Sequence, residues 1–232
     1  MPISNESRVL YVAAKAPRPG LAKTRLGVGL GETQALSLYK AFLRDIAENL
    51  PSGSYELGWF VTPADAWLDL GPLVAMSPAA PRVVAQPSGN WTDRQRWLFQ
   101  TMGDRGETFT VLIASDSPQV TAGIVEEAFE TLDHHDVVLG PTIDGGYFLI
   151  GMRGWFDVLR SIPMSTNTVL RNILANAKLQ GVSLALLHPT FDVDCAEDLD
   201  ALAEALRAGA SLPHTRAALA SLALESSIGV RP

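Results

Sequence analysis

The sequence predicts an α/β protein with a mostly parallel sheet, and two observations lead to this fold class. Short apolar runs such as Val9–Ala14 and Phe109–Ala114 have the length and residue types of buried strands. Segments with helical periodicity separate these runs along the chain. Strands that alternate with helices form parallel sheets through right-handed crossovers, so we expect that arrangement here.

Turn residues and hydrophobic periodicity place the individual elements. The expected strands cover residues 8–14, 55–61, 82–85, 109–114, 137–139, 147–151 and 182–187. The expected helices cover residues 32–50, 64–70, 90–102, 121–132, 166–179 and 196–207. Residues 72–81 are rich in Pro and Ala and are expected to form a loop, and Gly181 is expected to end a helix as a C-cap glycine.

The domain organisation expected from the sequence is simple. Residues 1–208 are expected to form one domain, and residues 209–232 a C-terminal tail with one possible helix. The apolar part of this tail could be a docking helix, a contact in a homodimer, or a cover for the core. A chain of 232 residues is long enough to bury a sizeable core.

Composition limits the kinds of protein this chain can be. With 47% hydrophobic and 19% charged residues the chain has the composition of an ordinary globular protein. Its net charge of −7 argues against nucleic acid as a partner. The single cysteine, Cys195, excludes an internal disulfide and favours a cytoplasmic protein. No apolar run approaches the roughly 20 residues of a membrane span, so we expect no membrane span.

The first loop is the most informative stretch. It follows the first expected strand and carries the basic residues Lys15, Arg18, Lys23 and Arg25 in an acidic chain. Ligands of α/β sheets bind beyond the C-terminal strand ends, so these cations are expected to bind a nucleotide's phosphates. The alternative is a solvated surface loop. The loop is neither a Walker A loop, since Ala22 precedes Lys23, nor a G-x-G-x-x-G fingerprint.

Three aspartates are candidates for a divalent metal, Mg²⁺ or Mn²⁺. Asp116 follows the expected central strand, where a carboxylate has a fixed position, although it could instead cap a turn before Pro118. Asp192 and Asp194 are spaced so that an extended segment would point both side chains the same way. Like charges this close are costly unless a cation relieves them, although Asp194 could also cap the following helix.

Two further stretches carry candidate substrate contacts. Asp144-Gly145-Gly146 precedes a strand and could be a plain turn, or a loop whose bare backbone lets a sugar or a base approach closely. Arg96 lies in the first turns of an expected helix, where it could be solvated or could reach the nucleotide.

Several motifs together resemble one protein family. The stretches are KAPRPGLAKTRL in the first loop, SDSP around Asp116, VVLGPTIDGGYFLIG, MSTNTVL and FDVDCAEDL. They resemble the bacterial GT-A-like proteins of the nucleotide-diphospho-sugar transferase superfamily, whose members are often labelled arsenosugar-biosynthesis-type glycosyltransferases. The resemblance covers residues 8–205. The related molybdenum-cofactor and phospholactate guanylyltransferases have a similar first loop, Asp-x-Pro and late aspartate segment.

The resemblance implies a GT-A fold, a Rossmann-like three-layer sandwich with a mostly parallel mixed sheet. It implies a nucleotide over the first loop and a divalent metal at Asp116, with help from Asp192 or Asp194. We therefore take Asp116 and Asp144 as candidate catalytic residues, and Gly145, Gly146 and Tyr147 as candidate substrate-binding residues.

Two departures from the family pattern bear on the chemistry. Many GT-A glycosyltransferases have Asp-x-Asp at the metal strand, whereas this chain has Asp116-Ser117-Pro118, which is more similar to the nucleotidyltransferases. The usual Gly-Asp-Leu-Gly-Glu-Arg stretch is replaced by residues 89–96, GNWTDRQR.

Three functions follow as hypotheses. The first is a metal-dependent glycosyltransferase that uses a nucleotide-activated sugar and a small-molecule acceptor. The second is a nucleotidyltransferase that joins a nucleoside triphosphate to a phosphorylated small molecule. The third is a non-catalytic nucleotide-binding protein.

Overall fold

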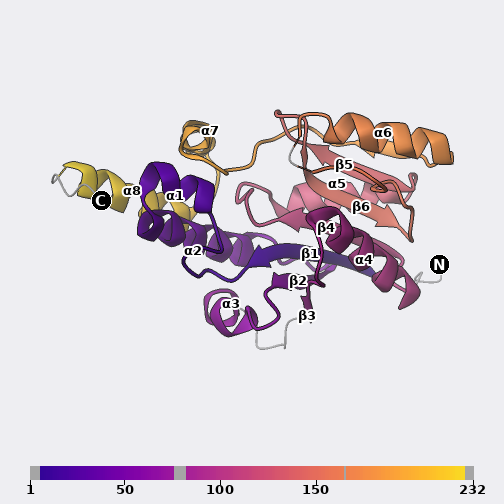
Figure 1. The fold of residues 1–232 in the computed structure, drawn as a ribbon, viewed down its shortest axis with the longest axis horizontal. Coiled ribbons are helices and arrows are strands. Elements are labelled where there is room, and N and C mark those ends of the chain that lie inside the picture. Colours follow the sequence, from indigo (N-terminus) through magenta and orange to yellow (C-terminus); the bar gives the residue numbers. More distant parts are fainter. Residues whose placement is uncertain (1–5, 76–81, 165, 228–232) are drawn as a thin grey trace.

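The computed structural model describes residues 6–75, 82–164 and 166–227, and its centre is a seven-stranded sheet (Figure 1). The strand order is β3-β2-β1-β4-β6-β5-β7, and β6 alone among them runs antiparallel to its neighbours β4 and β5. The strands are β1 (Arg8–Lys15), β2 (Glu56–Thr62), β3 (Arg82–Ala85), β4 (Phe109–Ala114), β5 (Val137–Pro141), β6 (Tyr147–Arg153) and β7 (Leu184–Leu186). The predicted α/β fold with a mostly parallel mixed sheet is confirmed.

Helices cover both faces of this sheet and make the molecule a three-layer sandwich. Alternate residues of β1 show the two faces, because Leu10 and Val12 pack with α2 and α5, whereas Val9 and Tyr11 pack with α4 and α6. The helices are α1 (Thr24–Leu30), α2 (Glu32–Asn49), α3 (Trp67–Val74), α4 (Trp91–Asp104), α5 (Ala122–Leu132), α6 (Val169–Gln180), α7 (Leu199–Arg207) and α8 (Pro213–Ser227), with a 3₁₀ turn at Ala196–Asp198.

The topology brings several loops to one edge of the sheet. β1 pairs in parallel with both β2 and β4, so the order of the strands reverses at β1. In open α/β sheets a ligand crevice forms at such a point, beyond the carboxyl ends of the strands. Because β6 is antiparallel, its first residue, Tyr147, lies at the same edge. The loops after β1, β4, β5 and β7 can therefore contribute to one site.

Two elements near the first half of the chain differ from the sequence prediction. Residues 24–30, expected as loop, form helix α1, although its two glycines disfavour a helix. Packing explains it, because Leu26 is fully buried in the core. The short helix α3 continues through Pro72 to Val74, so the expected loop starts later, and residues 76–81 lie outside the described part of the chain.

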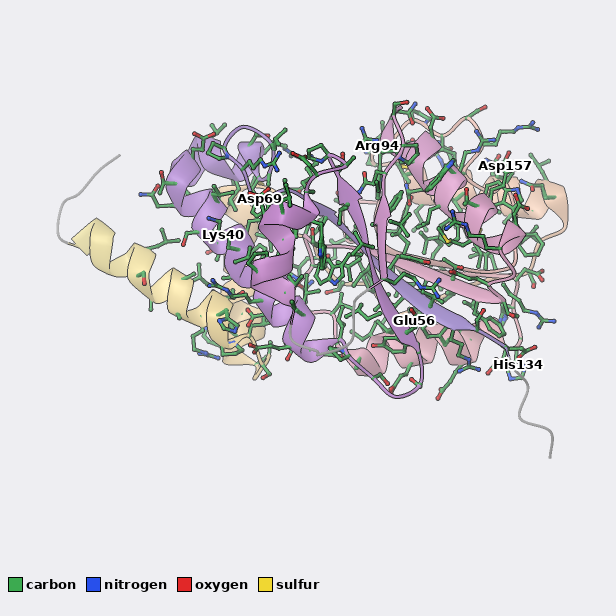
Figure 2. The ribbon with its side chains drawn as sticks, turned by 90° about the horizontal axis from the view of Figure 1, so that it is seen from below. Lys40, Glu56, Asp69, Arg94, His134 and Asp157 are labelled. Carbon is green, nitrogen blue, oxygen red and sulfur yellow. The ribbon has the colours of Figure 1, made fainter. Side chains whose placement is uncertain are left out.

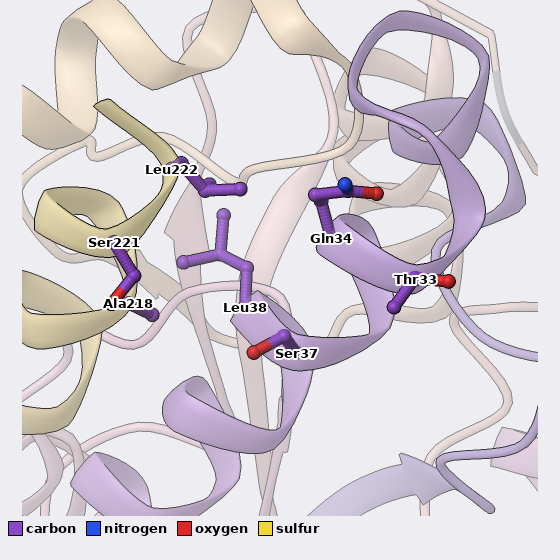
Figure 3. Close-up of a pocket in the computed structure, with 7 residues that line it drawn as sticks. All are labelled: Thr33, Gln34, Ser37, Leu38, Ala218, Ser221 and Leu222. Atoms are coloured by element: carbon purple, nitrogen blue, oxygen red, sulfur yellow. The ribbon is translucent and has the colours of Figure 1, made fainter. Parts of the chain in front are cut away.

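Helix α8 packs along α2 at the left of Figure 1. The buried side chain of Asp45 in α2 joins the two helices, because its two carboxylate oxygens accept the backbone N–H groups of His214 and Thr215 at 3.0 and 2.8 Å. A cavity of about 120 Å³ remains between them, lined by residues that include Leu38 and Leu222 (Figure 3). The described part of α8 thus packs against α2 and against the core cluster to which α2 contributes.

Candidate functional site

The first loop, the Asp116 loop and the late aspartate segment meet at the carboxyl edge of the sheet, as expected. The backbone N–H of Val193 donates to the carbonyl of Asp116 at 2.9 Å, which joins the β4 loop to the segment after β7. Helix α1 reaches the same segment, since a Cβ at Gly29 would lie only 2.6 Å from the Cβ of Ala196. Glycine at this position therefore allows the close approach of α1.

Lys23 lies at the centre of these contacts. Its ammonium Nζ is 2.5 Å from Asp116 Oδ1 and 3.7 Å from Asp194 Oδ1, and it donates to the Val193 carbonyl at 2.6 Å. The side chain is only 3% exposed. Its backbone has φ of 53°, in the left-handed region that side chains other than glycine rarely adopt. Strained backbone of this kind persists where the surroundings hold it, often at functional sites.

Arg25 and Asp194 form the outer part of the same cluster. Arg25 Nη1 lies 3.2 Å from Asp194 Oδ2, and its side chain is 72% exposed at the mouth of the site. Burial and the charge of Asp116 raise the pKa of Asp194, while Lys23 and Arg25 act in the opposite direction. The guanidinium of Arg25 is thus accessible to a ligand, unlike the ammonium of Lys23.

Asp192 continues the row of carboxylates toward the β5–β6 loop. Burial, and next the charges of Asp194 and Asp144, raise the pKa of Asp192 to about 6. The negative charges of Asp116, Asp194 and Asp144 all act on Asp192, and that of Asp116 also acts on Asp194. Such an accumulation of carboxylate oxygens suits a hard divalent cation, which takes oxygen ligands.

The Asp-Gly-Gly loop has a fixed backbone conformation. Asp144 Oδ1 accepts the hydroxyl of Thr142 at 2.5 Å and the N–H of Gly146 at 3.1 Å. Gly145 has φ of 92°, and a Cβ there would lie 2.5 Å from the carbonyl oxygen of Asn167. A side chain at Gly145 is therefore excluded by backbone geometry and by space.

Tyr147, expected among the substrate contacts, lies at the start of β6 and points into the α4 side of the core. Its hydroxyl donates to Gln95 Oε1 at 2.8 Å, and burial raises the pKa of its phenol. Gln95 is fully buried on α4, and its Nε2 has no hydrogen-bond partner among the described residues. The hydrogen bond from Tyr147 thus links the start of β6, beside the Asp-Gly-Gly loop, to α4.

The basic residues of the first loop do not all converge. Lys15 is exposed at the end of β1. Arg18 turns toward α3, where it pairs with Asp65 and Asp69 at 3.1 and 2.6 Å. Lys23 and Arg25 contact the aspartate cluster. In the first loop, Arg18 therefore anchors α3, whereas Lys23 and Arg25 form part of the candidate site.

Arg96 lies on α4 and forms a two-pronged ion pair with Asp157. Its Nε and Nη2 donate to the two carboxylate oxygens at 2.7 and 2.8 Å. Figure 2 shows Asp157 and Asp69, the partners of Arg96 and Arg18, in well-separated parts of the molecule. In this structure Arg96 is not grouped with Lys23 and Arg25.

Tyr39 of α2 is a site residue that sequence reasoning missed. Its hydroxyl accepts the N–H of Lys15 at 3.0 Å and lies 3.0 Å from Ser115 Oγ, so it ties the end of β1 to the residue before Asp116. Lys23 Nζ is 5.9 Å from the centre of its ring. Burial and the charge of Asp116 raise the pKa of this phenol, which keeps it protonated. The one signal in the sequence that could have identified Tyr39 is a polar hydroxyl on the apolar face of a helix.

Among the described residues, the acidic and histidine side chains whose ligand atoms all lie within 4.8 Å of one another are Asp45, Glu48 and His214, and not the aspartates around Lys23. The oxygens of this group are already used, because Asp45 accepts two N–H groups of α8 and His214 Nε2 lies 2.7 Å from Glu48 Oε1. These contacts anchor α8 to α2.

No described helix is long and apolar enough to cross a membrane.

The fold is similar to that of GT-A-like nucleotide-diphospho-sugar transferases, in agreement with the resemblance noted in the sequence. A family model described as "Uncharacterized protein conserved in bacteria (DUF2064)" matches residues 60–166, which include Asp116 and the Asp-Gly-Gly loop. No curated protein matches the sequence significantly.

Solved structures agree with this class. A proposed nucleotide-diphospho-sugar transferase from Desulfovibrio desulfuricans G20 is 28% identical, with a TM-score of 0.83 over 93% of this chain and 95% of that one. The 4-diphosphocytidyl-2C-methyl-D-erythritol synthase of Anaerococcus prevotii DSM 20548 is 10% identical, with a TM-score of 0.56 over 85% and 96% of the two chains. The second similarity shows a shared fold alone. Together the comparisons support a nucleotide-dependent transferase, the enzyme class predicted from the sequence.

Proposed function

We propose that this protein is a metal-dependent transferase that uses a nucleotide-activated sugar, that is, a glycosyltransferase. The observation that carries the proposal is the convergence of Lys23, Asp116 and Asp194 at the carboxyl edge of the sheet, beside the point where the strand order reverses. Transfer of a sugar from a nucleoside diphosphate leaves negative charge on the diphosphate. Cations at that place stabilise the leaving group.

We assign a role in substrate binding to each side chain from its position in the site. Arg25 is exposed beside the carboxylates and can bind the diphosphate, and the exposed Lys15 can assist it from the end of β1. Asp144 and the backbone of Gly145 and Gly146 face the sugar or the acceptor. The exposure of Asp144 supports that role, and the close contact between Gly145 and the Asn167 carbonyl fixes the backbone of the loop.

We propose that a divalent metal binds Asp116, Asp194 and Asp192. Burial first, and then the charges of neighbouring aspartates, raise the pKa values of Asp192 and Asp194, and a bound cation would relieve this repulsion. When bound, such an ion neutralises charge on the leaving phosphate. The acidic group at Asp45 is not proposed as this site, because its oxygens already accept hydrogen bonds.

Nucleotidyl transfer is the second candidate, and one feature favours it. The chain has Asp116-Ser117-Pro118 after β4 rather than Asp-x-Asp, so this strand end offers one carboxylate to a metal. In that reaction a phosphorylated small molecule attacks the α-phosphate of a nucleoside triphosphate and pyrophosphate leaves. The same cations and carboxylates would serve either reaction.

A thermal-shift panel tests the proposal. Its ligands are UDP-, GDP-, ADP- and CDP-sugars and the four nucleoside triphosphates, each with and without Mg²⁺ or Mn²⁺. A ligand at about 100 times its Kd adds roughly 2.7 kcal/mol of stability. For a chain of this size that raises Tm by on the order of 5–10 °C.

The pattern of shifts separates the two reactions. A metal-dependent shift with one nucleotide-sugar supports glycosyl transfer and identifies the donor. A shift with one triphosphate, followed by pyrophosphate release with a phosphorylated acceptor, replaces it with nucleotidyl transfer. No shift with any nucleotide contradicts both.

A further inference from the structure

The ammonium of Lys23 is enclosed by acceptors in this structure. It has three N–H donors. It contacts the Val193 carbonyl at 2.6 Å and Asp116 Oδ1 at 2.5 Å, and Asp194 Oδ1 lies at an ion-pair distance of 3.7 Å. The remaining surroundings are the rings of Tyr39 and Phe42, whose centres lie 5.9 and 5.8 Å away.

The two carboxylates that surround Lys23 are those that the proposed function assigns to the metal. An ammonium and a divalent cation both need the carboxylate oxygens, and a positive charge held 2.5 Å from Asp116 repels a second cation. Lys23 is also 3% exposed, so in this arrangement it cannot reach a nucleotide phosphate. The lysine expected to bind phosphate is thus engaged by the carboxylates expected to bind metal.

We propose that Lys23 is a positioning residue that competes with the divalent cation for Asp116 and Asp194. In the metal-free protein its ammonium holds the two carboxylates together. When a divalent cation binds them, the Lys23 side chain leaves and becomes available to the substrate phosphates. This inference rests on the proposed function, because it concerns the metal ligands assigned there.

Titration of Mn²⁺ without any nucleotide tests the competition, with free Mn²⁺ measured by electron paramagnetic resonance. The variant is Lys23→Gln, whose amide can still donate to the Val193 carbonyl. It is expected to bind Mn²⁺ about tenfold or more tighter than the wild type, because a nearby positive charge is removed. The matched control, Lys178→Gln, removes an exposed positive charge from α6, outside the first loop, and is expected to change the affinity less than about twofold.

A further variant separates failure of this inference from failure of the metal assignment. In the double variant Lys23→Gln with Asp116→Asn, Mn²⁺ binding is expected to be lost. If the wild type and Lys23→Gln bind Mn²⁺ equally while the double variant does not bind, the competition is wrong and the metal site stands. If none of the proteins binds Mn²⁺, both are wrong.

A measurement on the wild type covers the case in which Lys23→Gln does not fold. Lysine acetylation by a small reagent is followed residue by residue by mass spectrometry, with and without saturating Mg²⁺. Lys23 is expected to be protected without metal and to react several times faster with it, while the exposed Lys178 on α6 reacts at a constant rate. Protection of Lys23 that persists when Mg²⁺ is bound overturns the proposal.

Discussion

Two acidic clusters of this molecule have similar composition and opposite organisation. One contains Asp116, Asp192 and Asp194 at the carboxyl edge of the sheet, and the other contains Asp45 and Glu48 beside His214. In the second cluster, both oxygens of Asp45 accept N–H groups of α8, and Glu48 contacts His214 at 2.7 Å. In the first, the carboxylates act mainly on one another and on the side chains of Lys23 and Arg25.

The difference shows which carboxylates remain available to a ligand. Backbone N–H groups cannot move away from Asp45 without unfolding the start of α8, so the anchor is fixed. The ammonium of Lys23 is held by its ion pairs and by the Val193 carbonyl, but rotation about its side-chain torsions can move it away from Asp116 without unfolding a helix. A cluster whose partners are mobile side chains can exchange them for a ligand, whereas a cluster satisfied by backbone stabilises the fold.

The same substitution at each cluster tests this comparison, and the largest effect is expected at Asp116. Asp116→Asn is expected to lower metal-dependent turnover by about 100-fold or more, because it removes a charged ligand that contributes several kcal/mol of transition-state stabilisation. The fold is expected to persist, since the amide oxygen can still accept from Lys23. Turnover with the identified nucleotide and thermal unfolding measure the two effects.

Asp45→Asn is the counterpart and is expected to change stability instead. The amide keeps one acceptor but leaves one N–H of α8 without a partner, which costs about 2 kcal/mol. For a chain of this length, Tm is expected to fall by roughly 4–8 °C. Mn²⁺ affinity and turnover are expected to stay at the wild-type level. A loss of Mn²⁺ binding in this variant, with Asp116→Asn unaffected, would reverse the roles of the two clusters.

The sequence was sufficient to predict the fold class and the edge of the sheet where the site forms. Buried strands are short apolar runs, and the loops that follow Ala114 and Leu186 carry aspartates that the order of elements alone brings together. The resemblance to GT-A-like transferases added the mixed sheet. The prediction of the fold class and that of the sheet edge depend on local sequence patterns, and the folded chain keeps these patterns as strands and as the loops that follow them.

Helix α1 and the environment of Lys23 could not be predicted. The stretch at residues 24–30 has two glycines and weak helix propensity, and only its packing, with Leu26 buried and Gly29 against Ala196, makes it a helix. Lys23 lies just before this helix, so its left-handed backbone and its burial depend on the same packing. Lys23 also donates a hydrogen bond to the backbone carbonyl of Val193. Every residue has a backbone carbonyl, so the sequence does not indicate which one lies near Lys23.

The pairing of arginines was equally hidden from sequence, and it leads to the smallest of the expected effects. Arg25 is 72% exposed and has one contact at 3.2 Å with Asp194, whereas Arg96 donates two hydrogen bonds to Asp157. A guanidinium with one weak partner can turn to a phosphate at little cost. Arg25→Met is therefore expected to weaken nucleotide binding about tenfold.

Arg96→Met is the matched comparison, because it removes the same group from a side chain whose partner lies within the protein. Its effect on nucleotide affinity is expected to stay within about threefold, since the guanidinium of Arg96 is bound by both carboxylate oxygens of Asp157 and does not contact the site. Isothermal titration at low and high salt measures both variants, and the salt dependence is expected to decrease only for Arg25→Met. A larger loss at Arg96 than at Arg25 would mean that the Asp157 pair opens to admit the nucleotide, as the sequence had suggested. In that case, a side chain bound by backbone N–H groups, such as Asp45, would be unavailable to a ligand. A side chain bound by another side chain, such as Arg96, would still be available.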